Sequence, residues 1–460
     1  MAAGQNWAEV PSVLIVEILS YLSLKDRIKA SSVCKRWRSC LFHPSLWKRI
    51  VFKLDSCDRE GAKFLAGKCG RFISHAVVKF NSHNISEVRE CGRLLEIFSK
   101  NKNLQYFSLQ PLSCHLECSE ADSVHVTDKY LDLIEALIKQ SRQLRHFSLG
   151  CVEDLLVHSG TLIEALQRHH SSCLRSLHLA SVKENSESYG IVDLSPAMFR
   201  SFTALQHLSL DYDHLSNELF DSLAHPASPG LVTLTVHVHG VDHDHGSGGV
   251  SNDAWRRIAS HSNDTLRVTL NLVHSYDGVS ALLDILRPSM PLAHFRQFFC
   301  AQVSLAAVTF LWSHHCDTLR TVHIVDGLVD SAPGVYSELS QDPDPFVMMA
   351  WRCPKLEHLT VIGYEVAEEN IVAIARLRGD TLKTLDIPRC CISTVEEKAD
   401  SAWVSLGVVS DDFHTMVSQS LKREWRTLED YELPRAVFDD QADAEETYMA
   451  TLLADQVCAC

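Results

Sequence analysis

The sequence predicts an α/β solenoid, with parallel strands on its inner side and helices on its outer side. The first indication is a recurring unit, in which an amphipathic helix and a polar break precede Leu-x-x-(Leu/Phe/Val)-x-(Leu/Val/Ile). The second is that the unit recurs in one orientation at irregular steps, as in a repeat array with insertions. The third is composition, because 46% hydrophobic and 22% charged residues in a chain of 460 can fill a continuous core.

The first regular segment is residues 10–47, where we expect three short helices. The first helix has one apolar stripe, formed by Leu14, Ile15, Ile18, Leu19 and Leu22. Ser23 and Asp26 have the spacing of a capping box, which ends this helix and begins the next. Three helices in so short a segment cannot close a good core alone. The segment is therefore either a helical cap on the repeats or a unit that keeps apolar side chains for a partner.

Residues 10–47 resemble an F-box. The resemblance includes Val33-Cys34-Lys35-Arg36-Trp37-Arg38 and the closing Leu46-Trp47, while Val10 stands where the family usually has leucine. It implies that residues 5–52 form a three-helix F-box that binds a Skp-type adaptor and, through it, a cullin. The residues implied to face or support the adaptor are Pro11, Ile15, Ile18, Leu19, Leu22 and Trp47. Trp37 is expected in the F-box core.

Residues 53–395 are predicted to form an irregular leucine-rich-repeat horseshoe. Helix-and-strand units span Leu94–Leu109, Leu133–Leu149 and Leu162–Leu179, and further strand cores lie at 205–210, 231–236, 319–324, 356–361 and 382–387. Weaker copies lie near Leu266 and Leu292. The alternating apolar residues should point into the core and the residues between them to the concave, solvent-facing side. A doubly wound α/β domain is the alternative, but no Gly-rich phosphate loop follows a strand.

A second resemblance covers Asp344–Ile387. Its most specific parts are Ala350–Leu356 and Ile374–Gly379, which are similar to F-box proteins whose repeats are degenerate. The inserted loops and the segment after residue 396 do not share it. A client therefore cannot be inferred from this resemblance.

Four insertions interrupt the repeats, at residues 110–128, 181–196, 237–253 and 326–345, and are expected as loops at one rim. The third contains His237, His239, His243 and His245, which invites a metal site. However, it has no nearby cysteine and several glycines, so no metal and no cofactor is predicted. Cys114 and Cys118 with His115 form a second group that could bind a metal, and no metal is predicted there either.

The charge is unevenly placed. The net charge of −15 argues against binding of nucleic acid. Residues 1–54 hold 9 Lys/Arg against 3 Asp/Glu, a balance of +6, whereas residues 396–460 hold 5 against 15, a balance of −10. The two ends therefore suit different partners, and a basic F-box suits an acidic adaptor. The acidic segment is predicted to be helical around Trp403, Trp425 and Leu428 and disordered from Asp439 onward.

The 16 cysteines lack a disulfide-type spacing and a signal peptide, which predicts reduced thiols in the cytoplasm or nucleus. No apolar stretch is long enough for a membrane span. The motifs G-x-S-x-G, H-E-x-x-H, Walker A and the dinucleotide fingerprint are missing from the sequence, so no catalytic activity is predicted.

The F-box resemblance implies a non-catalytic substrate-recognition subunit of an SCF-type (Skp–cullin–F-box) E3 ubiquitin ligase. The alternative is a scaffold that binds the adaptor without forming a productive ligase. The client, and the residues that bind it, are not identified by the sequence.

Overall fold

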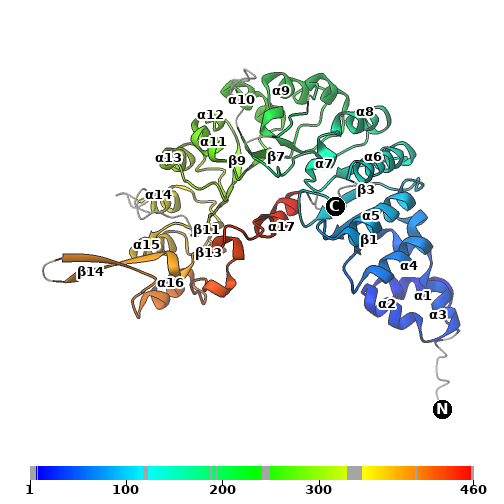
Figure 1. Cartoon of the computed structure of the whole chain (residues 1–460), viewed down its shortest axis with the longest axis horizontal. Coiled ribbons are helices and arrows are strands. Elements are labelled where there is room, and N and C mark those ends of the chain that lie inside the picture. The colour runs from blue at the N-terminus through cyan, green and yellow to red at the C-terminus, as the bar shows by residue number, and fades with distance from the viewer. Residues whose placement is uncertain are drawn as a thin grey trace, which may run out of the picture.

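The computed structural model describes residues 7, 9–117, 123–186, 189–192, 194–240, 249–328, 344–398 and 401–456. Its elements form an open arc, with strands along the inner side and helices along the outer side (Figure 1). None of the helices in these ranges is long and apolar enough to cross a membrane.

The inner side of the arc is one parallel sheet of 12 strands. The strands are β1 (Arg49–Lys53), β2 (His75–Phe80), β3 (Tyr106–Pro111), β4 (His146–Ser148), β5 (Ser176–His178), β6 (His207–Asp211), β7 (Thr233–Val238), β8 (Arg267–Val273), β9 (Leu292–Phe298), β10 (Thr321–Val325), β11 (His358–Ile362) and β13 (Thr384–Asp386). Each strand pairs with the strand of this sheet that comes next in the sequence, and β11 pairs with β13. A doubly wound sheet would reverse this order, so the predicted solenoid is confirmed.

The outer side consists of helices that alternate with these strands. They are α4 (Arg59–Cys69), α5 (Ile85–Phe98), α6 (Ser123–Gln140), α7 (Glu153–Leu156), α8 (Ser159–His170), η3 (Pro196–Ser201), α9 (Asn217–Leu223), α10 (Asn252–His261), α11 (Tyr276–Ser280), α12 (Leu282–Ile285), α13 (Leu305–His314), α14 (Pro345–Arg352) and α15 (Glu368–Arg378). The segments between a strand and the next helix supply several helix caps. The hydroxyls of Ser216, Ser251 and Ser304 each accept a hydrogen bond from the backbone N–H three residues later.

Strand register aligns the apolar positions of successive repeats. Leu208 of β6 lies beside Leu234 of β7, and both side chains are buried. The weak copies near residues 266 and 292 are full strands, β8 and β9. The expectation that the residues between the leucines face solvent is wrong in the middle of the sheet, where Ser209 is buried.

The N-terminal helices continue into the sheet without a linker. They are α1 (Ser12–Ser20), α2 (Leu24–Ser31), α3 (Lys35–Leu41) and the short helix η1 (Pro44–Trp47). Strand β1 begins at Arg49, inside the segment assigned to the F-box. One hydrophobic core runs from Ile15 through the repeats to Trp425, so the helices and the solenoid form one body.

The C-terminal segment corrects the sequence prediction. After a small sheet of β12 (Val366–Ala367), β14 (Ile392–Lys398) and β15 (Ser401–Leu406) come α16 (Phe413–Leu421) and α17 (Glu445–Asp455). The predicted disorder from Asp439 onward is therefore wrong for α17. Its acidic sequence resembles that of a disordered tail, but its apolar residues pack inside the arc.

Candidate protein-binding surfaces

The three N-terminal helices enclose a small core around Ile15, Leu19 and Trp47, none of which is more than 1% exposed. The indole N–H of Trp47 donates a hydrogen bond to the carbonyl of Leu41. These three predicted adaptor residues can support a binding surface from beneath, but they do not form that surface themselves.

Arg27 ties the helices together. Its guanidinium donates to the carbonyl oxygens of Leu19, Leu22 and Leu46 at 3.0, 3.2 and 2.7 Å and lies 5.5 Å from the centre of the Trp47 ring. Leu19 lies in the last turn of α1, Leu22 follows that helix, and Leu46 lies in η1; carbonyl oxygens at helix ends have few backbone partners. A single side chain from α2 thus fixes the mutual positions of these elements.

The surface of this unit carries apolar side chains that are not among the predicted adaptor residues. Six of them lie on α1 and α2 or in the turns that follow these helices, at 44–81% exposure, and we call them the apolar patch: Val13, Leu14, Tyr21, Leu24, Ile28 and Val33. Leu24 and Ile28 lie one helical turn apart on the same side of α2. Of the predicted adaptor residues, Pro11 is exposed and Ile18 and Leu22 are half-buried. Apolar side chains left exposed together mark a protein-binding surface.

The concave side of the sheet is partly occupied by α17, which lies inside the arc (Figure 1). Asp455 forms an ion pair with Arg296 of β9 at 2.5 Å. Gln456 accepts a hydrogen bond from the Ser148 hydroxyl of β4 at 2.5 Å. Helix α17 therefore bridges strands from both halves of the sheet.

Helix α17 is also held by a second apolar cluster, separate from the main core. Tyr448, Met449, Leu452 and Leu453 pack with side chains at the carboxyl ends of the strands, among them Phe298. The rings of Tyr448 and Phe298 are 5.4 Å apart. Leu452 is fully buried. This packing explains why an acidic segment forms an ordered helix here.

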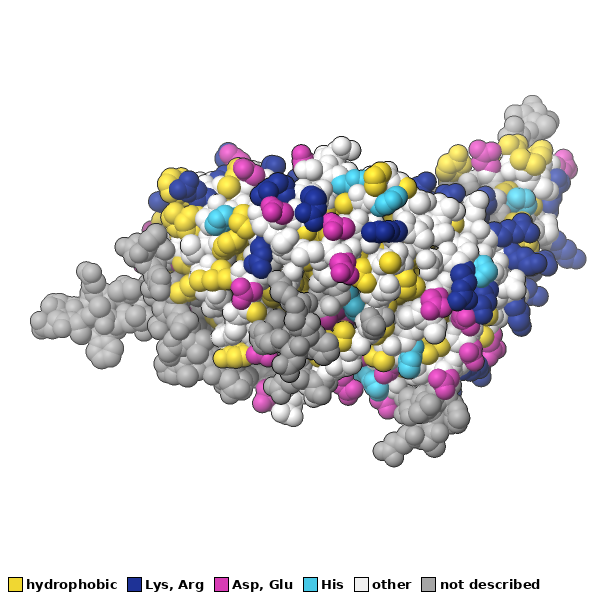
Figure 2. All heavy atoms as spheres, turned by 90° about the horizontal axis from the view of Figure 1, so that it is seen from above, with side chains coloured by type: hydrophobic (Ala, Val, Ile, Leu, Met, Phe, Trp, Pro, Cys, Tyr) yellow, Lys and Arg dark blue, Asp and Glu magenta, His cyan; other side chains and the backbone are white. Residues whose placement is uncertain are grey.

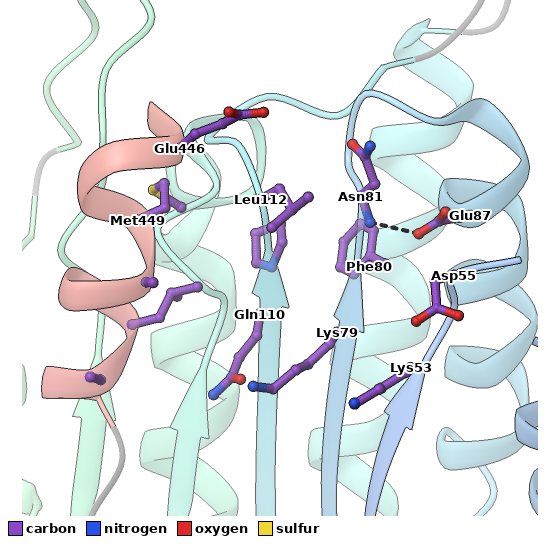
Figure 3. Close-up of a pocket in the computed structure, with 14 residues that line it drawn as sticks. Lys53, Asp55, Lys79, Phe80, Asn81, Glu87, Gln110, Leu112, Glu446 and Met449 are labelled. Carbon is purple, nitrogen blue, oxygen red and sulfur yellow. Dashed lines mark hydrogen bonds between the residues drawn. The ribbon is translucent and has the colours of Figure 1, made fainter. Parts of the chain in front are cut away.

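Between α17 and strands β1–β3 lies a hollow of about 720 Å³ (Figure 3). Its apolar walls include Phe80, Leu112 and Met449. Lys79 and Gln110 point toward each other at one end, and Glu446 of α17 lies at the other (Figure 3). Because basic and acidic groups both line it, this hollow has no single charge preference.

A buried polar network lies at the carboxyl ends of β6 and β7, where insertions 181–196 and 237–253 meet. Ring nitrogens of His237 and His239 lie 2.7 and 3.0 Å from the carbonyl oxygen of Ser181, so both nitrogens donate. Asp211 accepts hydrogen bonds from the Ser181 amide at 2.8 Å and from its hydroxyl at 2.6 Å. Burial lowers the pKa of His239 to about 4, which keeps it neutral.

The same network contains a buried cation, Lys183. Its ammonium lies 3.5 Å from Asp211 and 3.7 Å from Glu153. Burial alone would raise the pKa of Asp211, but His239 and Lys183 bring it down to about 2. Ligand atoms of Asp211, His237 and His239 lie within 4.8 Å of one another. However, they already contact Ser181, and Lys183 supplies the compensating charge, so we assign the network a structural role. His243 and His245 lie outside the described residues.

The second group considered for metal binding also has other partners. The thiol of Cys114 donates to the Glu445 carboxylate of α17 at 2.8 Å, and the amide of Cys114 donates to it at 2.7 Å. His115 pairs with Asp154 at 3.1 Å, and this contact raises the pKa of His115 to about 9. Cys118 lies outside the described residues. Two further cysteines, Cys91 and Cys353, are buried in the main hydrophobic core.

The fold defines a class of protein, an α/β solenoid that begins with a short helical unit. Residues 7–53 match the F-box-like family. The chain is 28% identical to F-box only protein 33 of Homo sapiens over 94% of this chain and 84% of that protein. It is 23% identical to F-box/LRR-repeat protein 21 of Ovis aries over 92% of this chain and 90% of that protein. The resemblance to F-box proteins with leucine-rich repeats, and to F-box only protein 33 in particular, is confirmed.

A solved structure is also similar. The crystal structure of the Rad7 and Elc1 complex in yeast contains a chain that aligns with a TM-score of 0.39 at 15% identity. The alignment covers 85% of this chain and 90% of that one. Likeness at this level supports no conclusion about binding.

Proposed function

We propose that this protein is a non-catalytic substrate-recognition subunit of an SCF-type E3 ubiquitin ligase, acting in the cytoplasm, the nucleus or both. The apolar patch on the F-box-like helices would bind a Skp-type adaptor and, through it, a cullin. The observation that carries this proposal is the patch itself, because a folded unit leaves large apolar side chains exposed next to a well-filled core.

The continuous core supports the proposed role in substrate recognition. Because the F-box-like helices and the repeats share one core, a client bound to the repeats would be held at a fixed position relative to the adaptor. A ligase receptor works by such positioning, which raises the concentration of client lysines beside the charged conjugating enzyme. The hollow between α17 and β1–β3 is one candidate place for a client, since it is open and partly apolar.

The test is a pull-down of the tagged full chain from cells. The variant Leu24→Asp/Ile28→Asp changes two patch residues that are 44% and 49% exposed. The matched control is Leu283→Asp/Leu377→Asp, at 47% and 40% exposure on the repeats. We expect adaptor and cullin to accompany the wild type and the control, but not the patch variant.

The outcomes separate this proposal from its alternative. Adaptor without cullin, or cullin without ubiquitylation of any co-purified protein, would favour a scaffold that does not form a productive ligase. Equal recovery of the adaptor with the patch variant would show that the F-box-like helices do not bind it through this surface.

A further inference from the structure

Helix α17 presents an ordered side to the inner face of the sheet. An acidic residue stands at each end of this helix, Glu445 at its first position and Asp455 at its last, which separates them by about 15 Å along the helix axis. Between them, four buried apolar residues recur at i, i+1, i+4 and i+5, which places them on one side of the helix: Tyr448, Met449, Leu452 and Leu453. The helix is therefore amphipathic, with a carboxylate at either end of its apolar side.

The protein holds each of these carboxylates with its own donors. Glu445 accepts hydrogen bonds from the amide and the thiol of Cys114, which follows β3. Asp455 pairs with Arg296 of β9 and accepts a hydrogen bond from the side-chain amide of Asn271 of β8 at 3.4 Å. Arg296 also donates to Asn271 at 3.4 Å, which fixes its guanidinium. The inner face thus has two acid-binding points on distant strands.

An aromatic platform lies between the two acid-binding points. His274 and Phe299 directly follow β8 and β9, and their rings stack with centres 5.7 Å apart. Their φ values are 49° and 51°, a conformation that non-glycine residues rarely adopt and that proteins tend to retain at functional sites. The hydroxyl of Tyr448 lies 3.1 Å from Nε2 of His274. The platform therefore receives the aromatic side chain of the helix.

Helix α17 is covered on one side and open on the other. Its apolar side packs in the second apolar cluster, whereas the main core is built from the F-box-like helices, the repeats and α16. On the other side, Glu446, Ala450 and Ala454 line the open hollow beside strands β1–β3 (Figure 3). Undocking of α17 would therefore uncover the inner face without breaking the main core.

The outer face of the arc carries its side chains differently. Figure 2 shows apolar, basic and acidic side chains interspersed over the repeats, and Lys and Arg side chains gathered at the end that carries the F-box-like helices. Beneath α17, by contrast, the contacts are sorted into an acid-binding point, an apolar middle and a second acid-binding point. Such an order can distinguish one helix sequence from another, on the concave face that solenoids use for binding.

We propose that the inner face beneath α17 binds an acidic amphipathic helix of a client protein, and that α17 occupies this face until the client displaces it. The client helix would share the pattern of α17, with a carboxylate at each end and large apolar residues on one side between them. The word client rests on the function proposed above, whereas binding of such a helix does not depend on it.

The first measurement uses the full chain and a fluorescein-labelled peptide with the sequence of residues 443–456. Leu452→Ala loosens α17 without changing the inner face, because Leu452 belongs to the helix. Fluorescence anisotropy should show peptide binding at least about tenfold tighter for Leu452→Ala than for the wild type, in which α17 competes. The control, Glu446→Ala, changes an exposed residue of the same helix and should bind the peptide like the wild type. Asp455→Asn replaces Leu452→Ala if that variant does not fold.

The inner face is tested in the loosened chain. Leu452→Ala/Arg296→Gln should bind the peptide at least about tenfold more weakly than Leu452→Ala, because the last carboxylate of the peptide loses its cation. The control, Leu452→Ala/Arg267→Gln, removes an exposed arginine of the neighbouring strand β8 and should bind like Leu452→Ala. Peptides selected on Leu452→Ala from a random library should show the acidic and apolar pattern of α17 and should compete with the labelled peptide.

Equal peptide affinity of the wild type and Leu452→Ala would overturn the proposal, as would unchanged affinity in the Arg296 variant or selected peptides without the pattern. A dimer of the wild-type chain in light scattering, dissociated by the peptide, would also overturn it, since α17 would then be exchanged between two copies. Adaptor affinity is measured on the same preparations. Peptide binding without adaptor binding would refute the ligase proposal alone, and the reverse would refute the proposed helix site alone.

Discussion

Replacing Leu452 with alanine should release α17 from the concave face while leaving the sheet intact. Leu452 is fully buried in the second apolar cluster. Removing a buried leucine side chain costs about 2–5 kcal/mol, because the transfer energy is lost and a cavity remains. Since α17 is a short helix that packs in a cluster separate from the main core, its least costly opening is local undocking and not unfolding of the repeats.

Hydrogen exchange measures this directly. A loss of about 2–5 kcal/mol lowers the protection of amides in Glu445–Asp455 by a factor of at least about thirty, since 1.4 kcal/mol corresponds to tenfold. Amides of β6 and β7 should keep their protection. The control is Glu446→Ala, an exposed residue of the same helix, for which a change within about 0.5 kcal/mol is expected. Unchanged protection of α17 in Leu452→Ala would refute the reasoning, as would equal loss across the sheet.

Three further predictions concern stability, each read from urea unfolding midpoints. The pKa values of buried His178 and His239 are about 3 and 4 in the folded chain, against about 6.5 in the unfolded chain, so the unfolded chain binds protons first as the pH falls. Each histidine therefore lowers the free energy of unfolding by about 1.4 kcal/mol per pH unit from about 6.5 down to about 4. A urea midpoint that does not fall between pH 7 and 5 would contradict this. Lys183→Met should destabilise the fold by about 3–5 kcal/mol, because it removes the cation that lies beside Asp211. Adding Asp211→Asn to this variant should restore part of the lost stability. Unchanged stability of Lys183→Met would argue against the network. Trp47→Ala should cost about 3–5 kcal/mol, whereas Leu24→Ala should stay within about 0.5 kcal/mol, and similar losses would contradict their buried and exposed positions.

The repeats could be predicted because their signal is local. The strands from β3 onward carry a strong or weak Leu-x-x-Leu-type pattern, whereas β1 and β2 carry none and were not predicted. Ser216 or Ser304 marks the following helix start within a few residues of its strand. The docking of α17 could not be predicted in this way. Tyr448 and Leu452 meet their partner Phe298 across a long sequence separation, and nothing near them in the sequence indicates an apolar surface.

The apolar patch also shows that a local sequence pattern cannot predict which side chains remain exposed. Leu14 and Leu19 belong to one predicted stripe, yet Leu14 is 50% exposed and Leu19 is fully buried. Helical spacing fixes the direction of a side chain but not whether the core or a partner covers it.

The central claim, that the F-box-like end binds a Skp-type adaptor through its apolar patch, is tested most directly with purified components. Calorimetric titration of the full chain with the adaptor should give the same Kd for the wild type and for Leu283→Asp/Leu377→Asp. For Leu24→Asp/Ile28→Asp the affinity should fall by at least about thirtyfold, since a residue central to an interface typically contributes about 2 kcal/mol or more. Wild-type affinity in that variant would contradict the claim.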